Sequence, residues 1–569
     1  MYNFHAAIFL PIKKQMMFRN LFTILLLTLS FAACKKGRSG DTTVPVNTNF
    51  RLTVNTLNNS TAGTQFGVPF KPTLRLVFNA PAKRSSISAG VSLRNSSGLI
   101  PVTAQYQNND SVVLIQPVNN LTPLTRYTFE ASILIQSSQD VTLQGSGAFY
   151  TFNTGIDSSR KFAAITDDAL LNLVQQQTFK YFWDFAHPVS GMSRERNTSG
   201  DLVTSGGSGF GIMTIPIGIN RNFITRSQGL SRMQTIIGFL KNNAQTFHGA
   251  YPHWLNGNNG AVLPFSANDN GADLVETSFL MAGLLTAREY FTDPGTTETN
   301  LRTDIDTIFN RVEWNWFRKN NENVLYWHWS PTFTWNINLP IRGWNECLIT
   351  YIMAAASTTY GIPASVYQTG FKGSNSYING NSYYGYTLPL GEPRGGPLFF
   401  SHYSFLGINP NGLSESGINF KTQNTNHSLI NYEYCRANPL NHYGYSDSVW
   451  GLTASDIENG YTASSPTNDV SVIAPTAALS SFPYTPQQSM AALKFYYYVL
   501  GDKLWKEYGF VDAFSLRNNW FASSFLAIDQ GPIVIMIENH RTQLIWNLLT
   551  NNQKVKAGMR TLGFTAPYL

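Results

Sequence analysis

The chain has 569 residues, 43% of them hydrophobic, which is enough for several domains and a large core and excludes a wholly disordered chain. Aromatic residues (14%) slightly outnumber charged residues (13%), whereas an average soluble protein is about 25% charged. The surface must therefore rely on neutral polar groups and rings, which suits a neutral, hydroxyl-rich partner. The formal charge of +7 falls to about +4 without the basic N-terminal segment, and this speaks against nucleic acid as a partner.

Residues 1–33 predict a signal peptide for export. Basic residues precede the apolar run 21–29, and a pair of alanines then meets Cys34. This arrangement resembles a bacterial lipobox, so Cys34 is the expected site of lipid attachment, with an ordinary signal peptide as the alternative. The small polar residues 34–47 are typical of a tether. We expect an exported, monomeric outer-membrane lipoprotein that faces either the periplasm or the cell surface.

Residues 48–156 predict a β-sandwich. Apolar and polar residues alternate in 74–78 and in 127–133, 112–115 is an apolar run, and turns rich in Asn, Ser and Gly separate these segments. The segment LTPLTRYTFEA at 121–131 resembles the late part of bacterial Ig-like domains found beside extracellular enzymes. We expect a spacer domain, with a sugar-binding module as the alternative.

From residue 157 to residue 569 the pattern becomes helical. Thr166 is a predicted N-cap, followed by apolar residues at helical spacing. Further helices are expected near 208–223, 227–244, 272–290, 299–317, 342–356, 488–500 and 532–550, the last with Pro532 in its first turn. About a dozen helices with long loops are compatible with an (α/α)6 toroid of paired helices.

Three carboxylates cluster around the predicted start of the helix at 272–290. Asp273 and Glu276 are three residues apart and share one helix face, and Asp269 lies in the preceding turn. Mutual repulsion should keep a proton on at least one of them, whereas the helix N-terminus favours the ionised form of Asp273. Such a split between pKa values is what acid/base chemistry needs. Helix capping by an aspartate, with Glu276 in solvent, is the alternative.

Glu346 stands in the segment IRGWNECLITYI, just after a loop that is dense in aromatic rings. The rings of Trp327 and Trp329 in that loop suit stacking on sugar faces, although a core cluster would use the same residues. The alternative for Glu346 is a buried acid paired with Arg342. Further acids follow downstream, each an ordinary loop or capping residue when taken alone: Asp456, Asp469, Asp512, Asp529 and Glu538.

Other chemistries find less support. The segment GGSGFG at 206–211 lacks the spacing and the lysine of a phosphate-binding loop. Neither a G-x-S-x-G elbow nor an H-E-x-x-H zinc motif occurs. Outside the signal only Cys347 and Cys435 remain, and they are either one disulfide or two free thiols. We therefore expect no metal and no cofactor.

The last 400 residues resemble the bacterial glucoamylase-like domain, which includes the endo-β-1,2-glucanases of glycoside hydrolase family 144. The resemblance covers nearly the whole segment, through stretches such as TFKYFWDFAHPVSGMSRERN, DLVETSFLMAGLL, RGWNECLITYI, SPTNDV and AIDQGPIVIMIEN. It implies an (α/α)6 toroid and metal-independent hydrolysis of a glucan by carboxyl groups. Inversion at the anomeric carbon is the implied stereochemistry.

By similarity, the candidate catalytic residues are Asp269, Asp273, Glu276, Glu346 and Asp529. Glu346 is the preferred first partner and the pair Asp273/Glu276 the second. The candidate substrate-binding residues are Arg194, His253, Trp254, Trp327, Trp329, Arg342, Trp450 and Asp456. An exo-acting glycosidase, a lyase on another glucan and a non-catalytic glycan-binding lipoprotein remain alternatives. The linkage, the mode of cleavage and the identity of the acid stay open at this stage.

Overall fold

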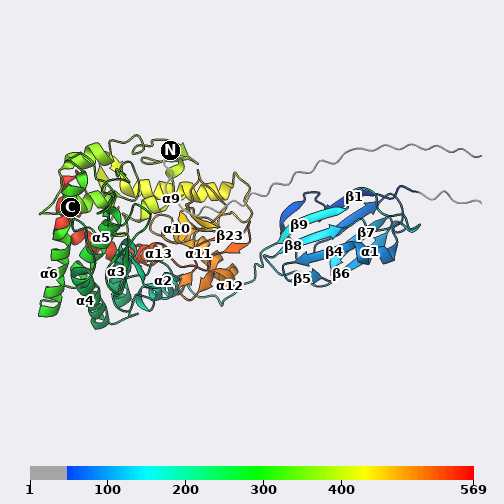
Figure 1. The fold of residues 1–569 in the computed structure, drawn as a ribbon, viewed down its shortest axis with the longest axis horizontal. Coiled ribbons are helices and arrows are strands. Elements are labelled where there is room, and N and C mark those ends of the chain that lie inside the picture. Colours follow the sequence, from blue (N-terminus) through cyan, green and yellow to red (C-terminus); the bar gives the residue numbers. More distant parts are fainter. Residues whose placement is uncertain (1–47) are drawn as a thin grey trace, which may run out of the picture. The chain divides into compact units, whose positions relative to one another are not determined.

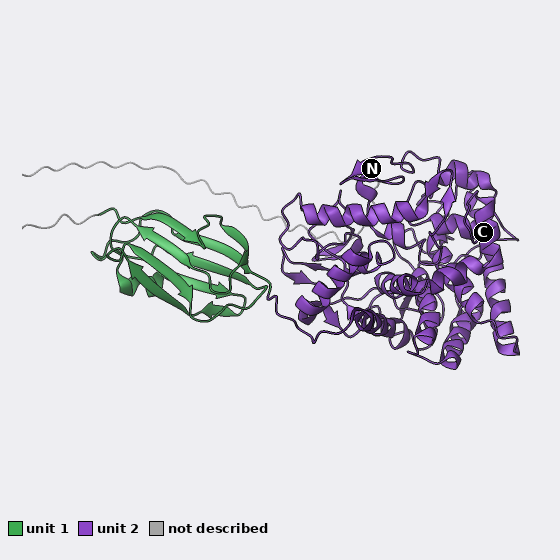
Figure 2. Ribbon diagram, turned by 180° about the vertical axis from the view of Figure 1, so that it is seen from behind, with its two compact units in different colours: residues 1–156 green, residues 157–569 purple. Residues whose placement is uncertain are grey.

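The computed structural model describes residues 48–569, which fall into two compact units that divide after Ile156 (Figure 2). The predicted signal peptide, the tether and Cys34 lie outside the described residues. Among the helices that are described, none combines the length and the apolar character that a membrane crossing needs.

The first unit is built from two β-sheets. One sheet has the order β1-β3-β7-β6 and the other β2-β9-β8-β4-β5, in which β2 and β9 run parallel. The strands are β1 (Leu52–Leu57), β2 (Thr64–Val68), β3 (Leu74–Phe78), β4 (Val91–Asn95), β5 (Gly98–Ile100), β6 (Val102–Gln107), β7 (Val112–Pro117), β8 (Arg126–Ala131) and β9 (Ala148–Thr154), with a short helix α1 (Arg84–Gly90).

Apolar residues of both sheets form one shared core. Leu74 and Leu76 of β3 alternate inward, and so do Tyr127 and Phe129 of β8, because successive side chains of a strand point to opposite faces. The predicted alternation through Ile133 is wrong at its end: β8 stops at Ala131, and Ile133 is 55% exposed in the following turn.

The second unit is mainly helical. Its long helices are α2 (Asp167–Trp183), α3 (Ser205–Asn220), α4 (Arg226–Asn242), α5 (Leu274–Tyr290), α6 (Thr296–Arg311), α7 (Leu348–Ala356), α9 (Phe420–Ala437), α11 (Pro486–Lys494), α13 (Ala527–Arg541), α14 (Leu544–Asn551) and α15 (Gln553–Thr561). Short elements between them include α8 (Phe399–His402), α10 (Pro475–Leu479), α12 (Gly501–Leu504) and the hairpin β19 (Ala454–Ile457)–β20 (Gly460–Ala463).

The helices α3, α5 and α13 form the centre of this unit, with α4 and α6 at its edge (Figure 1). The α3–α5 crossing brings two backbones together: a Cβ on Gly209 would lie 2.2 Å from the carbonyl oxygen of Phe279. Helical glycine costs about 1 kcal/mol relative to alanine, so packing must compensate for the glycines of α3. The segment GGSGFG is therefore the start of a buried helix.

Several predicted helix boundaries were wrong. The predicted helix at 532–550 is two helices, because α13 begins at Ala527 and Gln543 adopts a left-handed backbone (φ 60°) before α14. Pro532 consequently lies inside α13 rather than in its first turn. The predicted helices at 299–317 and 342–356 are shorter, α6 and α7 respectively. The N-cap at Thr166 is confirmed by its hydrogen bond from the amide of Ala169.

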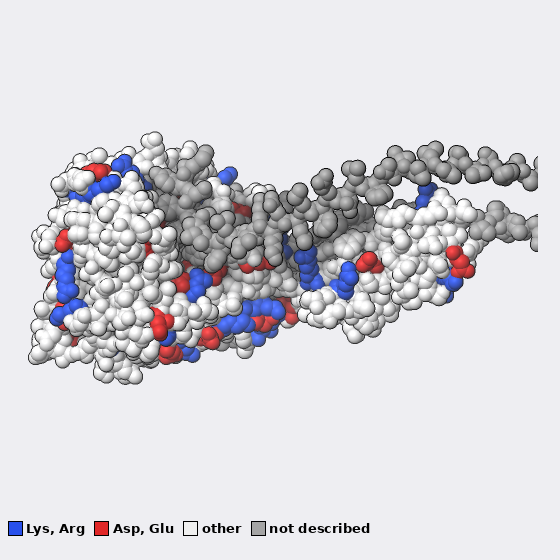
Figure 3. Space-filling view, viewed as in Figure 1, with Lys and Arg blue, Asp and Glu red and all other residues white. Residues whose placement is uncertain are grey.

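The surface carries few charges. Figure 3 shows a face on which basic and acidic side chains lie intermingled between wide uncharged areas. Cys347 and Cys435 are buried and unpaired, so of the two alternatives for these residues the structure has two free thiols.

Candidate active site

Asp273 lies at the start of α5, where it caps the helix. Its Oδ1 accepts the amides of Val275 (3.0 Å) and Glu276 (2.9 Å), and its Oδ2 is 2.9 Å from Nδ1 of His253. Burial works to raise the pKa of Asp273, but the hydrogen bond and the charge of His253 outweigh it and lower the pKa. The predicted helix start and the predicted ionised state of Asp273 are both confirmed.

A short pair of strands contains Asp273 and lies beside Asp269. The strands β13 (Ala272–Asp273) and β14 (His328–Trp329) pair, and Nδ1 of His328 lies 3.6 Å from Oδ2 of Asp269. Burial, followed by the charge of Asp273, raises the pKa of Asp269 to about 7. One atom each of Asp269, Asp273 and His328 lies within 4.8 Å of the others, as cation ligands do. His253 already compensates this charge, so we assign no metal here.

Glu276 is held against the first turn of α3. Its Oε2 accepts the amide of Gly206 at 2.7 Å and the hydroxyl of Thr204 at 3.3 Å. A Cβ at Gly206 would stand 2.5 Å from that oxygen, so only glycine allows this approach. Burial raises the pKa of Glu276, the charge of His253 opposes this, and the charge of Asp273 adds to the rise. The solvated position that was the alternative for Glu276 is wrong.

Glu346 stands just before α7, and its side chain is half-buried. The hydroxyl of Ser404 donates to the carbonyl of Glu346, which fixes the backbone at this point. Burial, and then the charges of Glu276, Glu392 and Asp273, raise the pKa of Glu346 to about 7. Among the described residues Arg342 forms no ion pair with Glu346, and its side chain is exposed, so the pairing alternative is wrong.

A second acidic group comes from the C-terminal half of the chain. Asp456 on β19 accepts from Arg196 (Nη1 to Oδ2, 3.2 Å) and from the hydroxyl of Ser524 (2.6 Å). Its backbone amide donates to Oδ2 of Asp512 at 2.7 Å. Asp529 lies in the first turn of α13 and belongs to this group, since burial and then the charge of Asp512 raise its pKa. The capping alternative for Asp529 is wrong, because Leu526 is the N-cap.

The two acidic groups share a neighbour in Tyr403, which follows α8. Burial, and then the charges of Asp529, Glu346 and Asp512 among others, raise the pKa of the Tyr403 phenol. The charges of Glu346 and Asp529 both act on this phenol, so Tyr403 is a common neighbour of the two acidic groups. The structure thus brings together all five candidate acids from three distant parts of the sequence.

Rings surround the first acidic group. His253 stacks on Phe265 with centroids 4.1 Å apart, and Trp254 meets the same ring edge-on at 4.8 Å. The backbone carbonyl of Trp327 accepts the amide of Leu274 at the start of α5. Trp329 is half-buried beside His328. These four candidates for substrate contact therefore lie at the acids, as the sequence predicted.

Two other candidates are not available to contact a substrate at the acids. Trp450 is completely buried and its Nε1 donates to the carbonyl of Gln488, so its assignment as a sugar-stacking residue is wrong. Arg194 bonds the carbonyls of Gly200 (2.7 Å) and Phe185 (2.6 Å), which occupies its guanidinium in holding a loop. Arg196, two residues later, reaches the acids instead.

Three further residues at the site were missed in the sequence, namely Tyr403, Glu392 and Arg196, and Asp512 was noted but not assigned to the site. The residues next to each of them in the sequence give no sign of a site, because the groups that surround each one in the fold come from distant parts of the chain. The only local signal was Asp512 itself, noted among the downstream acids without a partner.

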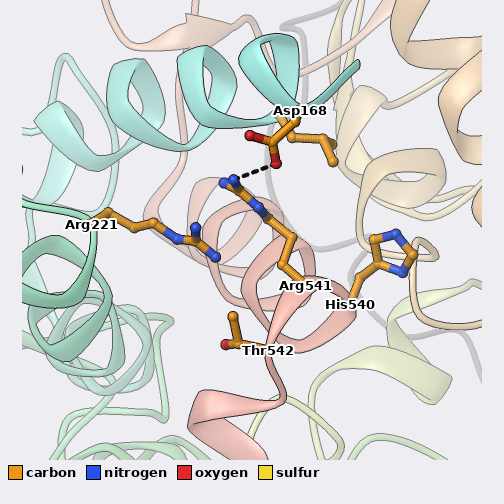
Figure 4. A pocket seen from close by; sticks show the side chains of 6 residues that line it. Asp168, Arg221, His540, Arg541 and Thr542 are labelled. Atoms are coloured by element: carbon orange, nitrogen blue, oxygen red, sulfur yellow. Dashed lines mark hydrogen bonds and ion pairs between the residues drawn. The ribbon is translucent and has the colours of Figure 1, made fainter. Parts of the chain in front are cut away.

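A hollow of about 440 Å³ lies at the other end of α13. Asp168, Leu171, Arg221, His540, Arg541 and Thr542 line it (Figure 4). Its charges are internally satisfied, since Arg541 pairs with Asp168 at 2.6 Å and Arg221 with Glu538 at 2.8 Å. The helix rise of about 1.5 Å per residue places it some 18 Å from Asp529, so it is not part of the acidic site.

Comparisons with known proteins match both units. Residues 338–553 match the family described as "Putative glucoamylase", and residues 38–154 match the bacterial Ig-like domain. A solved "putative glucoamylase" from Bacteroides uniformis is 51% identical, with a TM-score of 0.71, and the match covers 72% of this chain and 100% of that one.

Two further relatives have named activities. A solved endo-β-1,2-glucanase from Chitinophaga pinensis, in complex with sophorotriose and glucose, is 49% identical (TM-score 0.69), covering 71% of this chain and 100% of that one. A curated exo β-1,2-glucooligosaccharide sophorohydrolase (non-reducing end) from Parabacteroides distasonis is 41% identical over 484 residues, 80% of this chain. The match spans 66% of that relative's length.

Proposed function

Because the chain belongs to the bacterial glucoamylase-like family, we propose that it is a glycoside hydrolase that cleaves β-1,2-glucan. The observation that carries the proposal is Glu346: a half-buried residue whose pKa is raised to about 7 by burial and by the charges of neighbouring acids. Such a carboxyl is protonated often enough at neutral pH to donate a proton, as the hydrolysis of a glycosidic bond requires.

We assign the general acid to Glu346 and the general base to Asp529. Asp273 and Glu276 are poor bases, because Asp273 accepts three hydrogen bonds and Glu276 two in the protein interior. Their charges instead raise the pKa of Glu346. Asp529 is a neighbour of Tyr403 and receives no N–H or O–H donor from the described residues, so its oxygens remain available to a proton of water.

Endo cleavage is the preferred mode. The chain matches the full length of the endo-acting relative from Chitinophaga pinensis but 66% of the exo-acting relative. Short oligosaccharides would be the products, formed with inversion, as the resemblance implies. Trp254, Trp327 and Trp329 would stack on glucose rings beside the acids, with His253 as a polar contact and no cofactor.

The proposal also covers the architecture of the helical unit and the location of the protein. The helices would form an (α/α)6 toroid, which the sequence of contacts α7–α5–α3–α13–α10 supports as one arc of an inner ring. Cys34 would anchor the exported protein as a monomer to the outer membrane through a lipid, facing either side.

The test is hydrolysis of a panel of glucans of different linkage, with products identified by mass and optical rotation. Linear β-1,2-glucan should yield short β-1,2-linked oligosaccharides without unsaturated ends, whereas a lyase would leave such ends. Glu346→Gln should lower kcat by several hundred-fold or more, with an unchanged Tm as the sign of intact folding. Unchanged glucan binding and no hydrolysis by the wild type would instead identify a binding lipoprotein.

A further inference from the structure

Asp512 and Asp529 form a buried carboxyl pair. Asp512 lies between β22 (Gly509–Phe510) and β23 (Phe514–Ser515), and Asp529 lies on α13; the two residues are 2% and 1% exposed. In the described part of the chain, neither oxygen of Asp529 has a hydrogen-bond donor, and nor has Oδ1 of Asp512. Oδ2 of Asp512 accepts the amide of Asp456.

Such an arrangement needs a proton. An ionised carboxylate only accepts hydrogen bonds, so two carboxylates that face each other without donors would leave buried lone pairs and repelling charges. A proton on one carboxyl turns this contact into a hydrogen bond. Burial and the charge of Asp456 raise the pKa of Asp512 to about 7, and burial and the charge of Asp512 raise the pKa of Asp529 well above its usual range. The proton belongs to the pair and not to either carboxyl alone.

The charged groups around the pair do not replace this proton. Arg196 divides its guanidinium between Glu195 (2.9 Å) and Asp456 (3.2 Å). Tyr461 on β20 and Tyr403 after α8 face the acids, and both phenols have raised pKa values, so they stay neutral. Asp529 is thus surrounded by Asp512, Asp456, one shared arginine and two neutral phenols.

Resting on the proposed function, which makes Asp529 the general base, we propose that Asp512 is its positioning residue. In the active state the two carboxyl groups share one proton, and the pair accepts a second proton when water attacks. The water oxygen bonds to the anomeric carbon, its proton goes to Asp529, and the shared proton stays on Asp512. At the same time the glycosidic bond breaks and Glu346 gives its proton to the leaving oxygen. The pair becomes neutral as Glu346 becomes ionised, so charge is conserved.

The experiment compares Asp512→Asn, Asp529→Asn and the control Asp502→Asn on β-1,2-glucan. Asp502 is an exposed acid on α12, with a side chain 47% exposed. Asp512→Asn should lower kcat by about tenfold or more and change KM by less than about threefold. It should also move the acidic limb of the rate profile by half a pH unit or more, because a single carboxyl replaces a coupled pair. Asp502→Asn should match the wild type.

A second readout is independent of turnover. The folded wild-type pair holds protons that the unfolded chain releases above pH 4, so the contribution of the pair to the stability of the protein falls as the pH rises. Asp512→Asn removes one of these sites, so the Tm of the variant relative to that of the wild type should rise between pH 5 and pH 8. If the asparagine variant does not fold, Asp512→Ser supplies the same two measurements, because a hydroxyl can still accept the amide of Asp456.

The outcomes separate the two proposals. If Asp529→Asn hydrolyses glucan at the wild-type rate, the assignment of the base fails. If Asp529→Asn is inactive but Asp512→Asn keeps the wild-type pH profile and the wild-type slope of Tm, Asp512 is not the positioning residue. A uniform loss of rate with an unmoved acidic limb would also overturn the inference, since a purely structural role predicts it.

Discussion

Glu346 and the carboxyl pair set the pH dependence expected of the reaction. Glu346 must be protonated and the pair must have lost its first proton; the pKa values of Glu346 and of Asp512 are each raised to about 7. The rate should therefore show a bell-shaped dependence on pH, with both limbs near neutral pH. Initial rates on β-1,2-glucan from pH 4 to pH 10 test this. A plateau from pH 5 to pH 9 would contradict the assignment of these residues.

Substitution of Glu392 tests the assignment of Glu346 without altering Glu346 itself. Its charge helps to raise the pKa of Glu346, so Glu392→Gln should lower that pKa and move the alkaline limb of the rate profile to lower pH. The shift should be a few tenths of a pH unit. Glu433→Gln, on α9, is the matched control and should leave the limb in place. A limb that moves to higher pH would mean that Glu392 acts other than through its charge.

Residue by residue, the sequence predicted what depends on near neighbours. Asp273 was placed correctly because capping is decided within four residues. The half-buried state of Glu346 and the proximity of Asp512 to Asp529 depend on packing by distant elements, which residue spacing does not report. Trp450 was assigned wrongly for the same reason: it lies in a polar loop, yet residues that are far away in sequence bury it completely.

At the level of elements, the crossing of α3 and α5 holds the acids in place, since Glu276 on one helix binds Gly206 on the other. Gly209→Ala would push a Cβ into the backbone of α5, because the carbonyl of Phe279 lies only 2.2 Å from that position. We expect a loss of about 2–3 kcal/mol in the free energy of unfolding, and a fall of kcat, since Glu276 shifts with its helix.

Gly238→Ala on α4 is the matched control, since its Cβ would meet no atom within 4 Å. Alanine there should raise the free energy of unfolding by about 0.5–1 kcal/mol, because it favours the helix. Urea unfolding followed by circular dichroism measures both variants. Equal stabilities for the two would show that the helices separate to accommodate the methyl group.

The existence of most helices was predictable, but their ends were not. Apolar periodicity identified α2 to α6, whereas α9 was missed because its sequence is largely polar. Pro532 suggested a helix start, yet α13 continues through it, since the buried surroundings of the helix outweigh one lost backbone hydrogen bond. Such compensation is decided by tertiary packing and leaves no local pattern.

The whole molecule combines two units, each with its own core. The solved relatives from Bacteroides uniformis and Chitinophaga pinensis match 72% and 71% of this chain over their full lengths, so similar proteins exist at the size of the helical unit. We expect residues 157–569 alone to fold and to hydrolyse soluble glucan with a kcat within about twofold of the full chain. A much lower kcat, with the same Tm, would assign a role in catalysis to the Ig-like unit.

The stability of the whole molecule should fall as the pH rises. Four buried acids and the half-buried Glu346 have raised pKa values; the four are Asp269, Glu276, Asp512 and Asp529. Their stabilising contribution is complete below about pH 4 and is lost as the pH rises through their folded pKa values, which are about 7 for Asp269, Glu346 and Asp512. His253, raised to about 9, adds a loss between about pH 6.5 and 9. Buried histidines with lowered pKa values, such as His402 (about 3) and His427 (about 4), act in the opposite sense below about pH 6.5. Tm measured by calorimetry should therefore decrease from pH 6.5 to pH 8, and an increase in that range would contradict these pKa directions.

The same acids make the folded protein a reservoir of hydrogen ions. At pH 6 these acids hold protons that they lose in the unfolded chain, so unfolding releases them to the buffer, less the protons that buried histidines of lowered pKa take up. The apparent enthalpy of unfolding will then include the buffer's own heat of protonation. Scans at pH 6 in two buffers with different heats should differ by an amount that counts the released protons, and Asp512→Asn should reduce that count.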